Sequence, residues 1–157
     1  MTQFDLRDAL AEYRQGLDAE LGLLAQLTAL AQDQHHATGA NDYRALAAVS
    51  ERRGDLMRAL LEVEAQLRPV RGLIASHAEE ARHVDGFDDV ARLHREAEGL
   101  VATILTSDRS TLEALHTAEL ARRTASQAIE AGEATLAAYR KVIAPPLAPA
   151  GLVSRHG

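Results

Sequence analysis

Two Glu-x-x-His pairs come closest, by residue type and spacing, to a catalytic metal site in this chain. They are Glu80/His83 and Glu113/His116. A three-residue step places a carboxylate and an imidazole on one helix face, as carboxylate-bridged di-iron bundles require. A complete site would need one more glutamate from each of two further helices, from Glu96 or Glu98 and from Glu12 or Glu20. Seven histidines scattered among many glutamates give such pairs by chance, so we expect solvated surface residues and no metal cofactor.

No other group of residues predicts catalysis. His35-His36 lie beside a predicted turn, where a polar pair is ordinary. Aspartates surround Gly86, but the other ligand positions of a twelve-residue calcium loop are not filled in order. The chain has no Gly-x-Ser-x-Gly nucleophile motif, no glycine-rich phosphate loop and no cysteine. We therefore expect a protein that is not an enzyme and that needs no cofactor.

Composition predicts one all-α domain. The chain has 157 residues, is rich in Ala and Leu, and contains 3% aromatic residues and no Trp. Its net charge is −6 and its basic residues alternate with acidic ones, which argues against nucleic acid as a partner. The chain shows neither a basic start followed by an apolar run nor an apolar stretch of membrane-spanning length. We expect a soluble, cytoplasmic protein without membrane insertion.

An unbroken heptad in the middle of the chain indicates a coiled-coil-like bundle. Its positions, on alternating three- and four-residue steps, are Leu46, Val49, Arg53, Leu56, Leu60, Val63, Leu67, Val70 and Ile74. All are apolar apart from Arg53, so other helices must cover this stripe. Arg53 could fix the helix register, but we favour the alternative that it extends its charged head to solvent while its stem packs.

Three long helices should build the bundle in antiparallel order. The first is expected over about residues 3–36, followed by a turn with Gly39 as the stop and Asn41 or Asp42 as the next N-cap. The second should reach about residue 83, with a kink near Pro69. The pattern breaks again over residues 84–89, with Gly86 as the stop and Asp88 as the cap of the third helix.

The third helix should continue until Pro145. The alternative is a break at 106–108, where Ser107 or Asp108 could cap a new helix. The prolines at 145–149 predict an extended, mobile tail. The domain organisation is thus a bundle over 1–143 and a tail over 144–157.

Alanine dominates the apolar positions of residues 118–138. Only Leu120, Ile129 and Leu136 are larger there. Alanine favours the helix but buries little apolar area, so this stretch should dock weakly or leave room for another helix.

Two segments of the chain resemble the FlgN-like flagellar export chaperones. Residues 37–67 share with that family a Gly/Asp turn, a helix opening with spaced leucines, a basic residue at Arg53 and the pair Leu60-Leu61. The end is similar in Tyr139-Arg140, a Pro-rich link and an apolar pair before basic residues and Gly. Ser154 replaces an acidic residue of relatives, and Asn residues common in their last long helix are missing around 106–109.

The resemblance implies a cytoplasmic chaperone of flagellum biogenesis. Such a protein binds the C-terminal helix of hook-associated (hook–filament junction) proteins and delivers them to the type III export gate. The matching position for a tyrosine that docks on the gate is Tyr139. We expect the client helix to lie along the third helix near Leu112, Leu115, Ile129 and Leu136.

Three alternatives stay open from the sequence. One is an export chaperone for another flagellar client, such as the filament cap protein. Another is a di-metal carboxylate bundle built on the Glu-x-x-His pairs. The third is an oligomerising helical spacer, and homo-oligomerisation is left open in every case.

Overall fold

The protein is all-α, as its composition predicts. The computed structural model describes the backbone of residues 3–153 and the side chains of residues 5–142. Over residues 3–153 it contains no strand, and its helices are α1 (Gln3–Gly39), α2 (Tyr43–Ser76), α3 (Ala78–Ala81) and α4 (Phe87–Val153).

The chain divides into two compact units at a point inside α4. The first unit covers residues 1–114 and the second covers residues 115–157. The first therefore holds α1, α2, α3 and the start of α4, and the rest of α4 forms the second. The sequence analysis placed the limit of the packed domain at residue 143. The physical reason for the difference is that buried positions recur only as far as Thr111, and every side chain from 120 to 142 is exposed.

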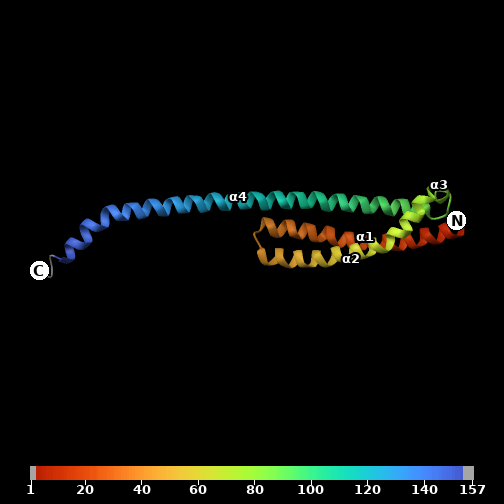
Figure 1. Ribbon diagram of the computed structural model, residues 1–157, viewed down its shortest axis with the longest axis horizontal. Helices are drawn as coiled ribbons and strands as arrows, with labels where there is room; N and C mark the ends of the chain where they lie inside the picture. The colour runs from red at the N-terminus through yellow and green to blue at the C-terminus, as the bar shows by residue number, and fades with distance from the viewer. Residues whose placement is uncertain (1–2, 154–157) are drawn as a thin grey trace. The chain divides into compact units, whose positions relative to one another are not determined.

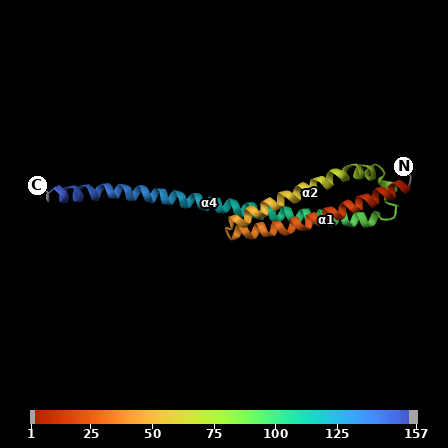
Figure 2. The same cartoon turned by 90° about the horizontal axis from the view of Figure 1, so that it is seen from below.

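Within the first unit, α2 runs back along α1, and the start of α4 lies beside α1 (Figures 1 and 2). Two apolar clusters join the three helices. One, near the N-terminal end of α1, contains Leu6, Leu10, Leu17, Leu67 and Leu93. The other contains Leu24, Leu27, Leu56, Ala97 and Ile104. All nine positions of the central heptad are buried or half-buried, so the predicted stripe does face the other helices.

The turn between α1 and α2 follows the predicted chemistry. Asn41 takes a left-handed backbone conformation (φ 54°), which asparagine tolerates better than most residues. Asp42 is the N-cap of α2, and its side chain accepts a hydrogen bond from the backbone nitrogen of Ala45 at 3.0 Å. The helix hairpin turn and its cap are confirmed.

The second helix is shorter than predicted. It ends at Ser76, and the four-residue helix α3 follows, so the expectation of one helix to residue 83 is wrong. The interruption lets the chain turn and bury Ala81 and Val84 in the N-terminal cluster. Pro69 lies inside α2, and the second half of this helix takes a different direction from the first (Figure 1).

The start of α4 differs from the prediction in its cap. Gly86 has a φ of 97°, which glycine reaches without strain, and α4 begins at the next residue, Phe87. Asp88 therefore lies in the first turn and is not the N-cap. An acidic side chain there is still favourable because the helix N-terminus carries partial positive charge.

From Phe87 onward α4 is one continuous helix to Val153. It does not break at Ser107, and the expected extended tail is wrong for residues 145–153. The φ of proline is compatible with a helix, so the three prolines remove backbone donors without ending it. Residues 154–157, the last part of the predicted tail, lie outside the described residues.

Candidate functional site

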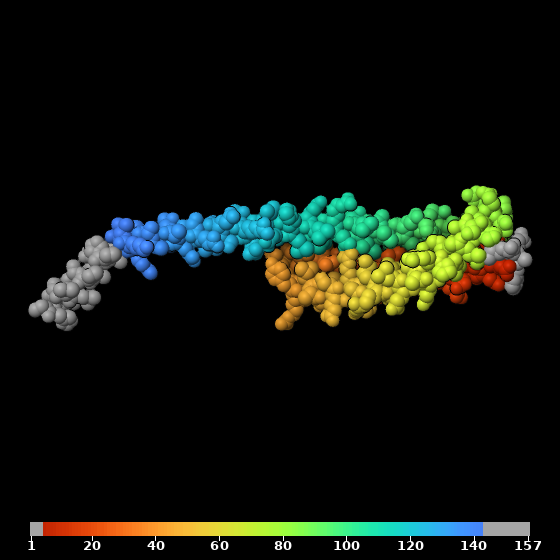
Figure 3. Space-filling model, viewed as in Figure 1, coloured from red at the N-terminus to blue at the C-terminus, as the bar shows by residue number. Residues whose placement is uncertain are grey.

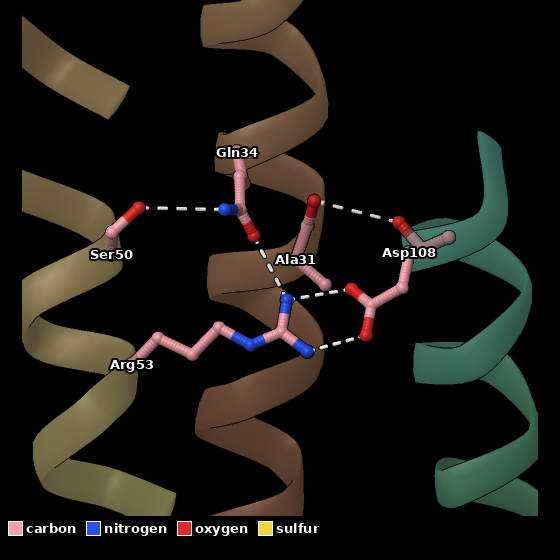
Figure 4. A network of polar contacts seen from close by, with 6 residues as sticks. Ala31, Gln34, Ser50, Arg53 and Asp108 are labelled. Atoms are coloured by element: carbon pink, nitrogen blue, oxygen red, sulfur yellow. Dashed lines mark hydrogen bonds and ion pairs between the residues drawn. The ribbon is translucent and has the colours of Figure 1, made fainter. Parts of the chain in front are cut away.

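Arg53 lies at the centre of a polar network that joins three helices (Figure 4). Its Nη1 donates to Asp108 Oδ1 on α4 at 2.6 Å and to Gln34 Oε1 on α1 at 2.8 Å, while its Nη2 donates to Asp108 Oδ2. Gln34 Nε2 in turn donates to Ser50 Oγ at 3.5 Å, and Ser107 Oγ donates to the Ala31 carbonyl at 3.4 Å.

The side chains of Arg53 and Asp108 are only 18% and 24% exposed. The prediction that Arg53 extends its head to solvent is therefore wrong. A two-pronged guanidinium–carboxylate pair has one favourable geometry, so it resists sliding of α2 along α4. The network sets the relative register of the helices in the first unit, which is a structural role.

A second polar group lies in the apolar interior around Glu20. This side chain is 5% exposed, and its Oε1 has no hydrogen-bond partner among the described residues. The carboxyl contacts that of Glu64. Arg71 donates to both oxygens of Glu64 at 2.9 and 2.8 Å and to the Tyr13 hydroxyl at 3.1 Å, with its guanidinium carbon 5.5 Å from the Tyr13 ring centre.

The two carboxyl groups have opposite electrostatic environments. Burial, together with the hydrogen bond to Glu64, raises the pKa of Glu20 to about 7. The guanidinium of Arg71 and the hydrogen bond from Glu20 lower the pKa of Glu64 to about 2. Glu20 is therefore the member of the pair that holds a proton most readily, and Glu64 is the charged partner of Arg71.

In the second unit, α4 presents large apolar side chains without cover among the described residues. The exposed fractions are 36% for Leu115, 62% for Ile129, 68% for Leu136 and 61% for Tyr139. Leu115, Ile129 and Leu136 are separated by multiples of seven residues, so they follow one line along the helix, and Tyr139 is one turn beyond Leu136. We call these four residues the α4 apolar face.

Two further leucines of α4 lie elsewhere. Leu112, which the sequence analysis assigned to the client site, is also exposed, but it belongs to the first unit. Leu120 is 49% exposed. At about 100° per residue it lies on the side of the helix opposite Ile129, so it is not part of the α4 apolar face.

Alanines, which have short side chains, lie beside the α4 apolar face in the second unit. Ala121, Ala125 and Ala128 are all exposed. The expectation that this stretch packs weakly is met within residues 120–142, since no side chain there is even half-buried. Small side chains allow a neighbouring helix to approach closely.

The described residues do not assemble a metal centre. No group of three or more His, Cys, Asp or Glu within them could hold an ion. Glu80 in α3 and His83 just after it are exposed, and Glu113 and His116 are exposed on α4. The di-metal alternative therefore has no support from the geometry.

The sequence did not predict the partners of Arg53 and Glu20. Glu20 lies between Leu17 and Leu24 in the alternating three- and four-residue pattern of α1, so its place in a buried stripe was readable. Asp108 lies four residues after the buried Ile104, but the sequence analysis assigned it a role only in the alternative of a helix break at 106–108, as a possible cap beside Ser107. Its pairing with Arg53 required knowing which parts of α2 and α4 lie side by side.

Comparisons with family models, curated proteins and solved structures found no match to this chain. In the part of the chain that the structure describes, none of the helices has the length and apolar character needed to cross a membrane.

Proposed function

We propose that this protein is a helical chaperone without enzymatic activity that holds an amphipathic helix of a client protein against α4. In its specific form, the proposal is a flagellar type III export chaperone that binds the C-terminal helix of hook-associated proteins in the cytoplasm. The observation that carries the general proposal is the exposed α4 apolar face. The specific client follows from the resemblance to the FlgN-like family.

Leaving this face in water costs free energy. Burying one large aliphatic side chain is worth about 1.5–3 kcal/mol. Leu115, Ile129 and Leu136 lie on one line of α4, so a single partner helix could bury all three. Clustered exposed apolar groups of this kind commonly mark interaction surfaces.

The first unit then acts as a frame. We propose that it is an antiparallel three-helix bundle of α1, α2 and the start of α4, with α3 as a connecting turn. Its core and the Arg53 network would hold the start of α4 in place, leaving the later part of α4 available for the client. The exposed ring of Tyr139 would contact the export gate after the client has bound.

Substitutions on the α4 apolar face test the proposal. Ile129→Asp and Leu136→Asp together place charges on the proposed contact line and should abolish binding of a synthetic C-terminal helix of a hook-associated protein from the same genome. Both residues are exposed, so circular dichroism should still report a helical, cooperatively unfolding chain.

Leu120→Asp is the matched control because it adds the same charge at an exposed leucine on the opposite side of α4. It should leave the affinity within about twofold. Unchanged affinity in the Ile129/Leu136 variant would contradict the placement. If a filament cap peptide binds and the hook-associated peptide does not, the proposed chaperone function is supported but its client is the filament cap protein.

A further inference from the structure

A groove in the first unit lies between α2 and α4, and α1 forms its floor. Its volume is about 340 Å³, and its lining includes Leu17, Glu20 and Leu60. In the space-filling view, atoms of α1 are visible between α2 and α4 (Figure 3). The lining spans residues 60–71 of α2 and 94–105 of α4, which at 1.5 Å per residue is about 16 Å along the helices.

The walls of this groove are apolar and incompletely covered. Val101 and Leu105, one turn apart on α4, are 41% and 58% exposed and line it. Leu60 on α2 lines it and is half-buried. Two helices flanking a third in this way leave the position that a fourth helix occupies in a four-helix bundle. The groove is open to solvent and is not an enclosed cavity, so its shape suits a helix better than an enclosed small molecule.

The charges of the groove select the chemistry of the occupant. Glu64 is already paired with Arg71, and Glu98 lies 3.4 Å from the Nδ1 of His94. Glu20 also lines the groove, and it is the buried side chain whose Oε1 has no partner among the described residues. An oxygen deprived of both water and a donor costs free energy, which a donor supplied by the occupant would restore.

We propose that the α2–α4 groove binds an amphipathic helix of a partner protein that carries one lysine or arginine within its apolar face, and that Glu20 pairs with this cation. The apolar side chains of the partner lie against Leu60, Val101 and Leu105. Burial and the contact with Glu64 raise the pKa of Glu20 more than the charge of Arg71 lowers it, and a cation from the partner would favour the ionised carboxylate. The inference is independent of the proposed function, since it concerns residues outside the α4 apolar face.

A pair of synthetic helical peptides tests the proposal with the full-length chain. Both have a leucine and alanine face, and the central position of that face is arginine in one and citrulline, its neutral analogue, in the other. The dissociation constants are measured by fluorescence anisotropy, and methyl NMR locates the contact. We expect the arginine peptide to bind at least tenfold more tightly and to shift the methyl signals of Leu60, Val101 and Leu105.

Two variants assign that preference to one carboxylate. Glu20→Gln keeps the side-chain shape and should reduce the difference between the peptides to less than twofold. Glu98→Gln removes the exposed carboxylate of the same groove and should leave the difference intact. Leu105→Asp, at an exposed wall position, should remove the methyl shifts without unfolding the chain.

Several results would overturn the proposal. They are equal affinities for the two peptides, no methyl shifts at millimolar peptide, and shifts confined to residues 115–142. A homodimer in sedimentation experiments that dissociates in Glu20→Gln would also overturn it, because the occupant would then be a second copy of this chain. Ile129→Asp with Leu136→Asp should not alter the preference for arginine, so failure here is distinguishable from failure of the proposed function.

Discussion

Arg53 and Glu20 are charged residues at positions where a helix heptad is otherwise apolar, and their environments differ. The guanidinium of Arg53 meets a full carboxylate, with Gln34 as a further acceptor. The carboxyl of Glu20 and the guanidinium of Arg71 both contact Glu64, and one Glu20 oxygen has no hydrogen-bond partner among the residues that the structure describes. A charge pair whose hydrogen bonds are all made specifies geometry, whereas a buried polar group without a partner costs stability. We therefore infer that Arg53 sets the register of the helices and that Glu20 takes part in recognition of a partner.

Asp108→Ala tests the register network. Removal of the carboxylate leaves Arg53 largely buried without its counter-charge, so the free energy of unfolding in urea should fall by about 1–3 kcal/mol. Asp55→Ala removes an exposed ion pair with Arg58 and should change stability by less than about 0.5 kcal/mol. Equal effects of the two substitutions would argue against a network role for Asp108.

The pH dependence of stability tests the environment of Glu20. Its folded pKa of about 7 lies above the ordinary value of 4.5, so between these pH values the folded state holds a proton that the unfolded state has lost. The stability that this group contributes is therefore lost as pH rises through that window, by on the order of 3 kcal/mol. The pKa of Glu64 is lowered to about 2, so this group acts in the opposite sense. Its contribution to stability is lost as pH falls from 4.5 toward 2.

Glu20→Gln should remove the decline in stability between pH 4.5 and 7 while keeping the loss below pH 4.5. Urea unfolding at several pH values measures both windows. Parallel profiles for the wild-type protein and Glu20→Gln would show that Glu20 has an ordinary pKa.

At the scale of helices, the contact of α1 with α2 depends on a glycine. A Cβ built on Gly16 would lie 2.1 Å from Leu67 Cδ2 and 2.6 Å from its Cγ, and Leu67 is buried. Leu67 of α2 therefore fills the space that a side chain at position 16 of α1 would need. Glycine at this position permits the packing of Leu67, although alanine would favour the helix itself.

Gly16→Ala should therefore destabilise the protein by about 1–2 kcal/mol in urea unfolding, since overpacking outweighs the gain in helix propensity. Gly22→Ala is the matched control on the same helix, because nothing lies within 4 Å of its added Cβ. It should be neutral or stabilising by up to about 1 kcal/mol. Stabilisation by both substitutions would contradict the close approach at Gly16.

At the scale of the whole molecule, the two units differ in what maintains their helices. The first unit has apolar clusters that join α1, α2 and α4. In the second unit, the exposed side chains of residues 120–142 leave helix propensity and local ion pairs, such as Glu119 with Arg122, as the main stabilising terms. Backbone hydrogen bonds there should open locally without unfolding of the first unit.

Amide hydrogen exchange measures this difference. Amides of residues 120–140 should exchange at least about a hundredfold faster than those of Leu10–Leu27 in α1. Addition of a client helix should slow exchange in 120–140. Uniform protection along the free chain would show that a partner or a second copy already covers this part of α4.

The sequence by itself determined the helical class, the first hairpin with its Asp42 cap, and the inward face of the α2 heptad. These features depend on residues close together in the chain, where periodicity and capping are decisive. Only the tertiary structure decided the end of α2 at Ser76, the pairing of Arg53 with Asp108, and the groove around Glu20. Each depends on which surfaces of distant helices meet, and side-chain packing between helices, which local periodicity does not contain, determines that choice.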